Sequence, residues 1–229
     1  MSGPVRHCGV CGAPARASFR APHPEIAPEL DMRPGEPARS TLPDWVQTCS
    51  RCTAAAPDLS VLPPAARAIV EDPAYRALTT TVSAETLPFR RWALICRGTG
   101  DTANAAEALL QGAWAADDAA AMTDAATLRQ EVATLWGETT DTGTALRRLD
   151  ALRRAGQFES ASTWAATLAA RGLDETARTI IAFQQARTAL RDTGPHLISS
   201  ALPPPAHAPH VSHGKRPSPG FWTRLFRKS

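Results

Sequence analysis

Hydrophobic residues recur every three or four positions along most of the chain after Val61. This spacing places apolar side chains on one face of an α-helix. The clearest stretch begins at Leu87-Pro88 and ends near Gly98, and its apolar stripe consists of Phe89, Trp92, Ala93, Ile95 and Cys96. The pattern predicts a mainly α-helical body over residues 61–198, with Cys96 among its core residues.

Turn and capping residues divide this body into successive helices. Proline at a helix start, Asp at an N-cap and Gly after the last turn are the usual boundary signals. In chain order, the predicted elements are short helices between Val61 and Leu78, a helix from Leu87 to Gly98, a helix capped by Asp101, a helix over about 119–137, a pair of helices on either side of Gly156, and an amphipathic helix over 173–192. The short connections between them favour antiparallel helical hairpins.

Two of the predicted hairpins share a pattern when they are aligned on Gly100 and Gly156. The matched pairs are Phe89 with Ala145, Ala93 with Leu149, Cys96 with Leu152, Ala105 with Ala161, and Leu109 with Ala165. The order Phe89-x-x-Trp92-Ala93-x-x-Cys96-x-x-x-Gly100-Asp101-x-x-x-Ala105 resembles the tetratricopeptide repeat, whose period is about 34 residues. Because the two glycines are 56 residues apart, we expect an inserted helix and therefore an irregular array.

Residues 1–60 carry little periodicity but hold two Cys-x-x-Cys pairs. The pairs are Cys8-Gly9-Val10-Cys11-Gly12 and Cys49-Ser50-Arg51-Cys52. Each such turn supplies two thiolates, so two turns supply the four ligands of a tetrahedral zinc ion. We expect a small zinc-ribbon-like module in which Cys8, Cys11, Cys49 and Cys52 bind one structural Zn²⁺. The alternatives are a redox dithiol, an iron–sulfur centre, degenerate knuckles without metal, or a site that uses His7 or His23.

A zinc ion held by four thiolates has no position left for catalysis, because a catalytic zinc keeps one open for water or substrate. The sequence contains no Gly-rich phosphate loop, no Gly-x-Ser-x-Gly and no His-Glu-x-x-His motif. The adjacent carboxylates Asp117 and Asp118 are expected at a solvated helix end, since neighbours on a helix point about 100° apart. We therefore expect no enzyme, no catalytic residue and no small-molecule substrate.

The C-terminal region changes character after about residue 198. Residues 199–220 form a Pro- and His-rich linker that is expected to be disordered, and residues 221–229 form a basic aromatic motif. Segments of this composition bury too little apolar surface to order themselves. We expect the motif to fold on a partner protein or on an anionic membrane surface, unless the tail is inert. The candidate partner-binding residues are Phe221, Trp222, Arg224, Leu225, Phe226, Arg227 and Lys228.

The net charge of +3 is unevenly distributed. From Ala206 to Ser229 there are five Lys or Arg and no acidic residue, whereas residues 1–60 hold six Arg and six Asp or Glu. Nucleic acid is therefore a disfavoured partner, because its recognition needs clustered positive charge. The sequence has no apolar leader and no run of about 18 apolar residues, so a cytoplasmic location is expected.

Several motifs together resemble an uncharacterised bacterial family, the domain of unknown function 2225, over about residues 5–198. Besides the first knuckle, they are Leu30-Asp31-Met32-Arg33-Pro34, Trp45-Val46-Gln47-x-Cys49-x-x-Cys52, Tyr75-Arg76-Ala77-Leu78, Trp92-Ala93-Leu94 leading to Gly100-Asp101, Ala113-Trp114-Ala115-x-Asp117-Asp118, Asp150-x-Leu152-Arg153-Arg154-x-Gly156-x-Phe158, and Phe183-Gln184. The resemblance implies a zinc-ribbon-like start followed by tetratricopeptide-like helices. It implies an architecture and no particular reaction.

The sequence therefore predicts four parts: a zinc-ribbon-like module (1–60), a tetratricopeptide-like helical domain (61–198), a linker (199–220) and a tail motif (221–229). The expected function is that of a non-catalytic cytoplasmic adaptor whose concave helical face binds a protein or peptide. A nucleic-acid-associated zinc-ribbon protein is one alternative. A scaffold recruited to a membrane surface through its tail is the other.

Overall fold

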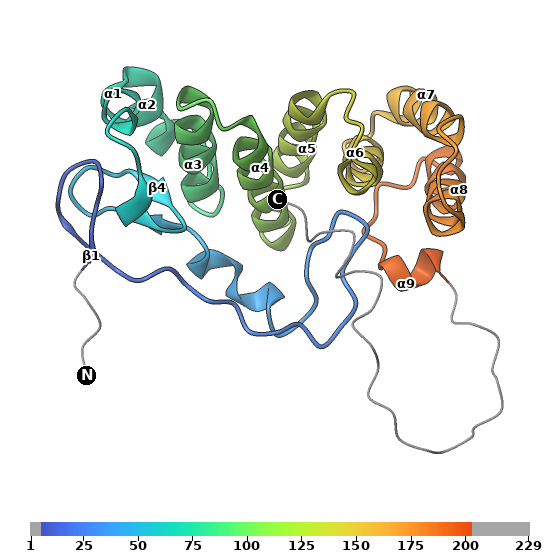
Figure 1. Cartoon of the computed structure of the whole chain (residues 1–229), viewed down its shortest axis with the longest axis horizontal. Helices are drawn as coiled ribbons and strands as arrows, with labels where there is room; N and C mark the ends of the chain where they lie inside the picture. Colours follow the sequence, from blue (N-terminus) through green and yellow to red (C-terminus); the bar gives the residue numbers. More distant parts are fainter. Residues whose placement is uncertain (1–5, 203–229) are drawn as a thin grey trace, which may run out of the picture.

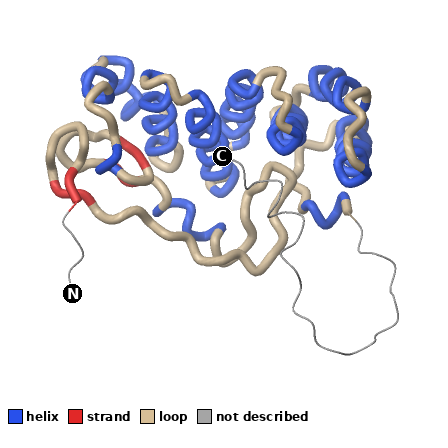
Figure 2. The backbone as a smooth tube through the Cα atoms, viewed as in Figure 1, coloured by secondary structure: helices blue, strands red, loops and turns tan. Residues whose placement is uncertain are grey.

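The computed structural model describes residues 6–202, so the tail motif over 221–229 and most of the linker lie outside the described residues. The described chain is mainly helical, as predicted (Figures 1 and 2). The helices are α1 (Ala66–Glu71), α2 (Pro73–Thr81), α3 (Leu87–Gly98), α4 (Thr102–Asp118), α5 (Met122–Trp136), α6 (Thr142–Arg154), α7 (Phe158–Ala169), α8 (Glu175–Ala189) and α9 (Ile198–Ala201).

Aspartates begin several of these helices. The carboxylate of Asp101 accepts a hydrogen bond from the backbone N–H of Asn104 at 3.1 Å, and Asp141 and Asp174 cap α6 and α8 in the same way. Such a cap satisfies one of the backbone donors that a helix start leaves unpaired. The starts of α4, α6 and α8 are therefore fixed by local sequence.

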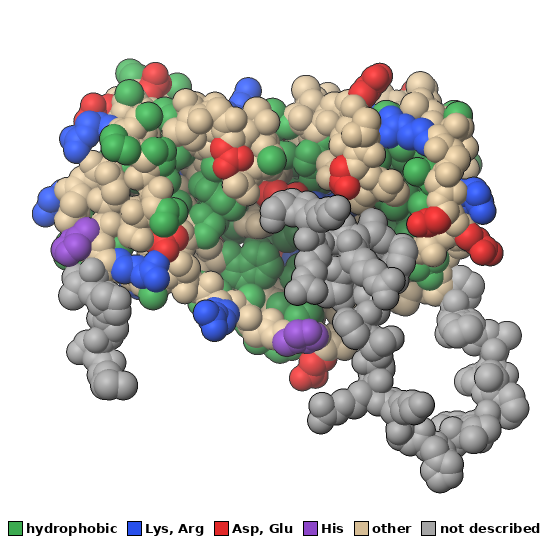
Figure 3. All heavy atoms as spheres, viewed as in Figure 1, with side chains coloured by type: hydrophobic (Ala, Val, Ile, Leu, Met, Phe, Trp, Pro, Cys, Tyr) green, Lys and Arg blue, Asp and Glu red, His purple; other side chains and the backbone are tan. Residues whose placement is uncertain are grey.

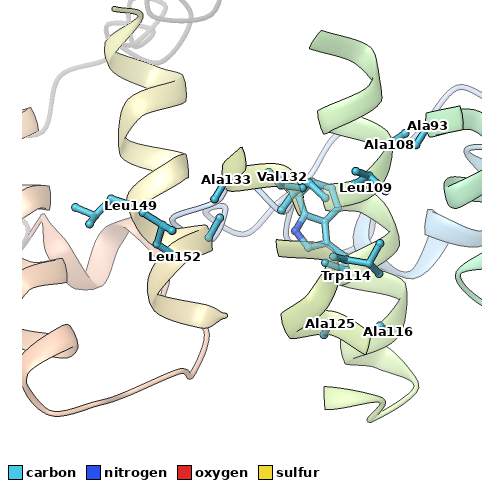
Figure 4. Packing of buried hydrophobic residues seen from close by; sticks show 14 of the residues in the cluster. Ala93, Ala108, Leu109, Trp114, Ala116, Ala125, Val132, Ala133, Leu149 and Leu152 are labelled. Atoms are coloured by element: carbon cyan, nitrogen blue, oxygen red, sulfur yellow. The ribbon is translucent and has the colours of Figure 1, made fainter. Parts of the chain in front are cut away.

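Helices α3 to α8 pack side by side in chain order and form an arched row (Figure 1). Small residues let neighbouring helices approach closely: a Cβ added at Gly112 of α4 would lie 3.2 Å from the Cβ of Phe89 in α3. Trp114 and Leu109 fill the core of the row beside Val132 (Figure 4). Phe89, Ala93, Ile95 and Cys96 of the apolar stripe predicted from the sequence are buried, and Trp92 is partly buried.

The turns at Gly100 and Gly156 have the same hydrogen-bonded form. The N–H of Asp101 donates to the carbonyl of Cys96 at 2.8 Å, and the N–H of Gln157 donates to that of Leu152 at 2.9 Å. Both glycines have positive φ, at 84° and 73°. These are the bonds of a Schellman motif, in which glycine is favoured. Helix α5 lies between the two hairpins, as expected, and their relation to tetratricopeptide repeats stays a prediction.

The N-terminal region contains two short antiparallel hairpins. Strand β1 (Arg6–His7) pairs with β2 (Pro14–Ala15), and β3 (Gln47–Thr48) pairs with β4 (Ala55–Ala56). A 3₁₀ turn, η2 (Leu59–Val61), then leads into α1. Each hairpin holds one Cys-x-x-Cys turn between its strands.

Residues 25–46, here called the crossing segment, follow the first hairpin after a connection over residues 16–24 and run beneath the row of helices (Figure 1). The segment includes the 3₁₀ turn η1 (Arg39–Asp44). Backbone bonds tie it to the other end of the molecule, since Leu30 donates to His196 and Ile198 donates to Pro28, both at 2.9 Å. Hydrophobic side chains gather between the segment and the helices on the face shown in Figure 3. The crossing segment therefore occupies much of the helical face on which a partner was expected.

Within residues 6–202, no helix has both the length and the apolar character that crossing a lipid bilayer requires.

Candidate metal centre

The four cysteines predicted to be ligands lie together. Their sulfur atoms are all within 4.8 Å of one another. The Sγ atoms of Cys8 and Cys52 are 3.8 Å apart, and those of Cys11 and Cys49 are 3.6 Å apart. A disulfide would bring two sulfurs to about 2.05 Å, so all four cysteines are free thiols.

The sulfur spacing fits a tetrahedral metal site. With metal–sulfur bonds of about 2.3 Å, the edge of a regular tetrahedron of sulfurs is about 3.8 Å. The two short sulfur–sulfur distances match this edge, and each joins one cysteine of the first pair to one of the second. The four residues could therefore share a single metal ion, and four soft sulfur donors are a ligand set that zinc accepts.

The two Cys-x-x-Cys turns have nearly the same backbone. The N–H of Gly12 donates to the carbonyl of Cys8 at 2.8 Å, and the N–H of Thr53 donates to that of Cys49 at 2.9 Å. Gly12 and Thr53 both have positive φ, at 72° and 62°. Such a backbone suits glycine and strains a β-branched residue. The second knuckle therefore keeps the geometry of the first despite its different residues.

Residues outside the knuckles fix their positions. The hydroxyl of Tyr75 in α2 donates to the carbonyl of Thr53 at 2.9 Å, and Arg67 in α1 donates to the carbonyl of Val10 at 2.6 Å. The N–H of Gly9 donates to the carbonyl of Leu59 at 2.9 Å. A Cβ at Gly9 would lie 2.2 Å from the carbonyl oxygen of Leu62, so this position accepts only glycine without a shift of the backbone.

The surroundings of the sulfurs affect their ionisation differently. Burial opposes the thiolate of Cys49, but hydrogen bonds from the backbone of Cys52 and Arg51 and from neighbouring thiols outweigh it and lower the pKa to about 7. Burial and the adjacent sulfurs raise the pKa of Cys52 above its ordinary value. Crowded thiols resist full ionisation because their negative charges repel, and a bound cation removes that repulsion.

His7 and His23, the alternative ligands considered from the sequence, are not part of this cluster. His7 is exposed, and no histidine joins the four cysteines as a potential ligand among the described residues. Cys96 is buried in α3, where burial raises the pKa of its thiol to about 12. This supports the prediction that Cys96 is a core residue.

The prediction for the carboxylates at the end of α4 is wrong for Asp117. Its side chain is only 10% exposed and contacts Arg129 and Arg154, while Asp118 is more exposed and pairs with Arg33 and Arg39. The prediction fails because Arg129 of α5 and Arg154 of α6 pack against Asp117, and the crossing segment adds Arg33 at 3.8 Å.

Asp31 of the crossing segment is the most enclosed member of the resulting charged cluster. Its carboxylate is fully buried, lies 3.2 Å from Nη1 of Arg154, and accepts the indole N–H of Trp114 at 2.9 Å. Burial alone would raise the pKa of Asp31, but Arg154, Arg129 and Trp114 hold it below its ordinary value. Glu29 lies at the edge of the cluster, where burial and the charge of Asp31 raise its pKa.

The carboxylates and guanidinium groups of this cluster balance one another. Glu29, Asp31, Asp117 and Asp118 face Arg33, Arg39, Arg129 and Arg154. Paired buried charges of this kind are expensive to separate. The cluster therefore fastens the crossing segment to α4, α5 and α6. The charged cluster was not predicted from the sequence. The one indication of it was Arg129, a charged residue on the buried stripe of α5 beside Leu128.

No protein-family model, curated protein or solved structure matches this chain. The resemblance to the family of domain of unknown function 2225 therefore stays a prediction.

Proposed function

We propose that this protein is a non-catalytic zinc-binding adaptor of the cytoplasm, which binds a protein or peptide partner through the surface of its helices. The observation that carries the proposal is the convergence of four sulfurs on one point. Four protein ligands complete a tetrahedral zinc site, so the ion would stabilise structure and leave no position for substrate. Zinc would join the two hairpins, whose two-residue strands offer little stability of their own.

The partner surface is proposed to lie away from the crossing segment, since that segment already covers the face of α4 to α6. A shallow cavity of about 630 Å³ lies between α1, α2 and α3. Ile69, Tyr75 and Leu94 supply much of its apolar lining, and Arg97 lies at the same depression. An apolar depression with a charged residue beside it suits a short amphipathic peptide segment.

Metal analysis tests the zinc part of this proposal. Protein purified without chelators should contain about one zinc per chain, and Cys49→Ser should lose most of it. Cys96→Ser is the matched control, because Cys96 is a buried thiol outside the cluster. Purified wild-type protein without a bound divalent metal would contradict the assignment.

Affinity capture from the native host tests the adaptor part. Ala74→Glu adds a charge at the depression, at an exposed position of α2, and Ala182→Glu adds the same charge on the exposed side of α8. A specific partner should be retained by wild type and Ala182→Glu and lost with Ala74→Glu. Equal recovery with all three proteins, or no partner at all, would count against this surface.

The nucleic-acid alternative gains one observation from the fold. Helices α1, α2 and α3 bring Arg67, Arg76 and Arg91 close to Arg51 of the second knuckle. Positive charge near a zinc ribbon suits phosphate contacts. A mobility shift of bulk DNA or RNA that weakens steeply with salt would favour this alternative over the adaptor. The membrane alternative depends on the tail, and loss of vesicle binding on deletion of residues 206–229 would support it.

A further inference from the structure

A cavity of about 430 Å³ opens beside the second knuckle, between it and helices α1 to α3. Four arginines line it: Arg51 from the knuckle, Arg67 from α1, Arg76 from α2 and Arg91 from α3. Glu71 is the single acidic residue among the described residues of the lining. The cavity therefore has a formal excess of three positive charges before any metal is counted.

Arg91 differs from the other buried arginines of the described chain. Arg33, Arg129, Arg153 and Arg154 each lie within 4.0 Å of at least one carboxylate oxygen. Arg91 is 6% exposed, yet no described carboxylate pairs with it. Its Nη2 donates to the hydroxyl of Thr79 at 2.7 Å, and its guanidinium lies 5.4 Å from the centre of the Tyr75 ring.

A buried positive charge without a negative partner is unfavourable, and an anion bound beside Arg91 would supply that partner. The metal centre accounts for part of the positive charge, since zinc with four thiolates carries about −2. Arg51 and Arg67 face the knuckles, where they donate to the carbonyl oxygens of Cys11 and Val10. Arg76 and Arg91 remain, and neither pairs with a described carboxylate.

We propose that this cavity binds the phosphate group of a small phosphorylated molecule. Guanidinium groups hold phosphate oxygens through paired charge-assisted hydrogen bonds, and the Thr79 hydroxyl is a further polar group in the lining. The volume exceeds that of phosphate alone and lies in the usual range for small-molecule sites. A terminal phosphate can enter a recess and reach Arg91, whereas a polymer backbone would lie across the opening. The described lining includes no aromatic side chain on which a base could stack.

Calorimetric titration of the zinc-loaded full chain with glycerol 3-phosphate tests this inference. Inorganic phosphate tests binding of the anion without an organic group, and glycerol is the control that lacks the phosphate. Saturable binding is expected for both anions and not for glycerol. Arg76→Gln and Arg91→Gln should each weaken binding by about tenfold or more, because each removes a charge-assisted contact. Arg178→Gln, which removes an exposed arginine of α8 outside the cavity, should bind as wild type does.

Failure of glycerol 3-phosphate and inorganic phosphate to bind would overturn the proposal, and so would equal affinity in Arg76→Gln and Arg178→Gln. If Arg91→Gln does not fold, the exposed Arg76 carries the test. If a single-stranded oligonucleotide binds more tightly than glycerol 3-phosphate and Arg76→Gln weakens that binding, the site is a nucleic-acid site and this proposal is wrong. Zinc content is measured on every sample. If the chain binds phosphate but contains no metal, the zinc assignment is wrong and this inference stands. If the chain contains zinc but does not bind phosphate, this inference is wrong and the zinc assignment stands.

Discussion

Trp114 donates its indole N–H to the carboxylate of Asp31 at 2.9 Å, across 83 positions of sequence. The contact joins the crossing segment to the middle of the helical row, and both side chains are buried. The same carboxylate oxygen lies 3.2 Å from Arg154 in α6. The carboxylate of Asp31 thus anchors the crossing segment in the interior of the helical body.

Asp31→Asn should therefore destabilise the protein strongly. Asparagine keeps an oxygen that can accept the Trp114 bond but removes the charge opposite Arg154 and Arg129. Removing one charge from a buried network of ion pairs costs about 3 kcal/mol, because Arg154 and Arg129 then share less buried negative charge, chiefly that of Asp117. Urea unfolding followed by tryptophan fluorescence measures the loss.

Asp44→Asn is the matched control for this substitution, since Asp44 lies in the same segment and is exposed. It should change the free energy of unfolding by less than about 0.5 kcal/mol. Zinc content should be the same in both variants, because neither residue contacts the cysteines. A loss in Asp44→Asn as large as that in Asp31→Asn would show that the charged cluster does not fasten the segment.

Asp58 should make part of the stability depend on pH. Hydrogen bonds from Ser60 lower its pKa to about 2, from an ordinary value of 3.8, with help from Ser18 and Arg6. Because the pKa is lower in the folded state, the ionised carboxylate stabilises the fold above about pH 3.8, and this contribution is lost as the pH falls towards 2.

The measurement compares wild type with Asp58→Asn at each pH. At pH 7 the variant should be less stable by about 1 kcal/mol, and the difference should shrink below about pH 4. Release of metal in acid affects both proteins and largely cancels in the comparison. A difference that stays constant down to pH 2.5 would contradict the assigned role of this carboxylate.

Replacing Thr53 by glycine should stabilise the second knuckle. Thr53 has a φ of 62°, where a β-branched residue is strained, and the equivalent position in the first knuckle is Gly12. Thr53→Gly should raise the free energy of unfolding by about 0.5–1 kcal/mol and bind zinc at least as tightly. The Tyr75 bond goes to the backbone carbonyl at this position and is retained.

Gly12→Ala is the reciprocal test. A Cβ added there meets nothing within 4 Å, so its cost is purely conformational, about 1 kcal/mol. Thermal unfolding of the zinc-loaded proteins gives both values. Destabilisation by Thr53→Gly, or no effect of Gly12→Ala, would mean that the left-handed backbone is not the limiting feature of the knuckles.

Local signals were enough to predict the main helices and the four cysteines that lie together. Gly100 and Gly156 mark two turns because their backbone needs positive φ, and the Cys-x-x-Cys spacing fixes two sulfurs on each knuckle. The charged cluster has no such signal, because Asp31 meets its partners only after distant segments pack together. The turn after α4 was also hard to locate, since Ala120 stands where the turns after α3 and α6 have glycine.

That turn provides the last prediction. Ala120 has a φ of 56°, and the N–H of Ala121 donates to the carbonyl of Ala116 at 2.8 Å, as in the glycine turns. Ala120 is exposed, so its side chain contributes little packing that glycine would lose. Ala120→Gly should therefore stabilise the protein by about 0.5–1 kcal/mol. Gly156→Ala should destabilise it by about 1 kcal/mol, because alanine is strained at a φ of 73° and the added Cβ meets nothing within 4 Å that would offset the strain. Urea unfolding of the two variants should show opposite shifts in midpoint at an unchanged slope. Shifts of the same sign would mean that left-handed strain does not limit these turns.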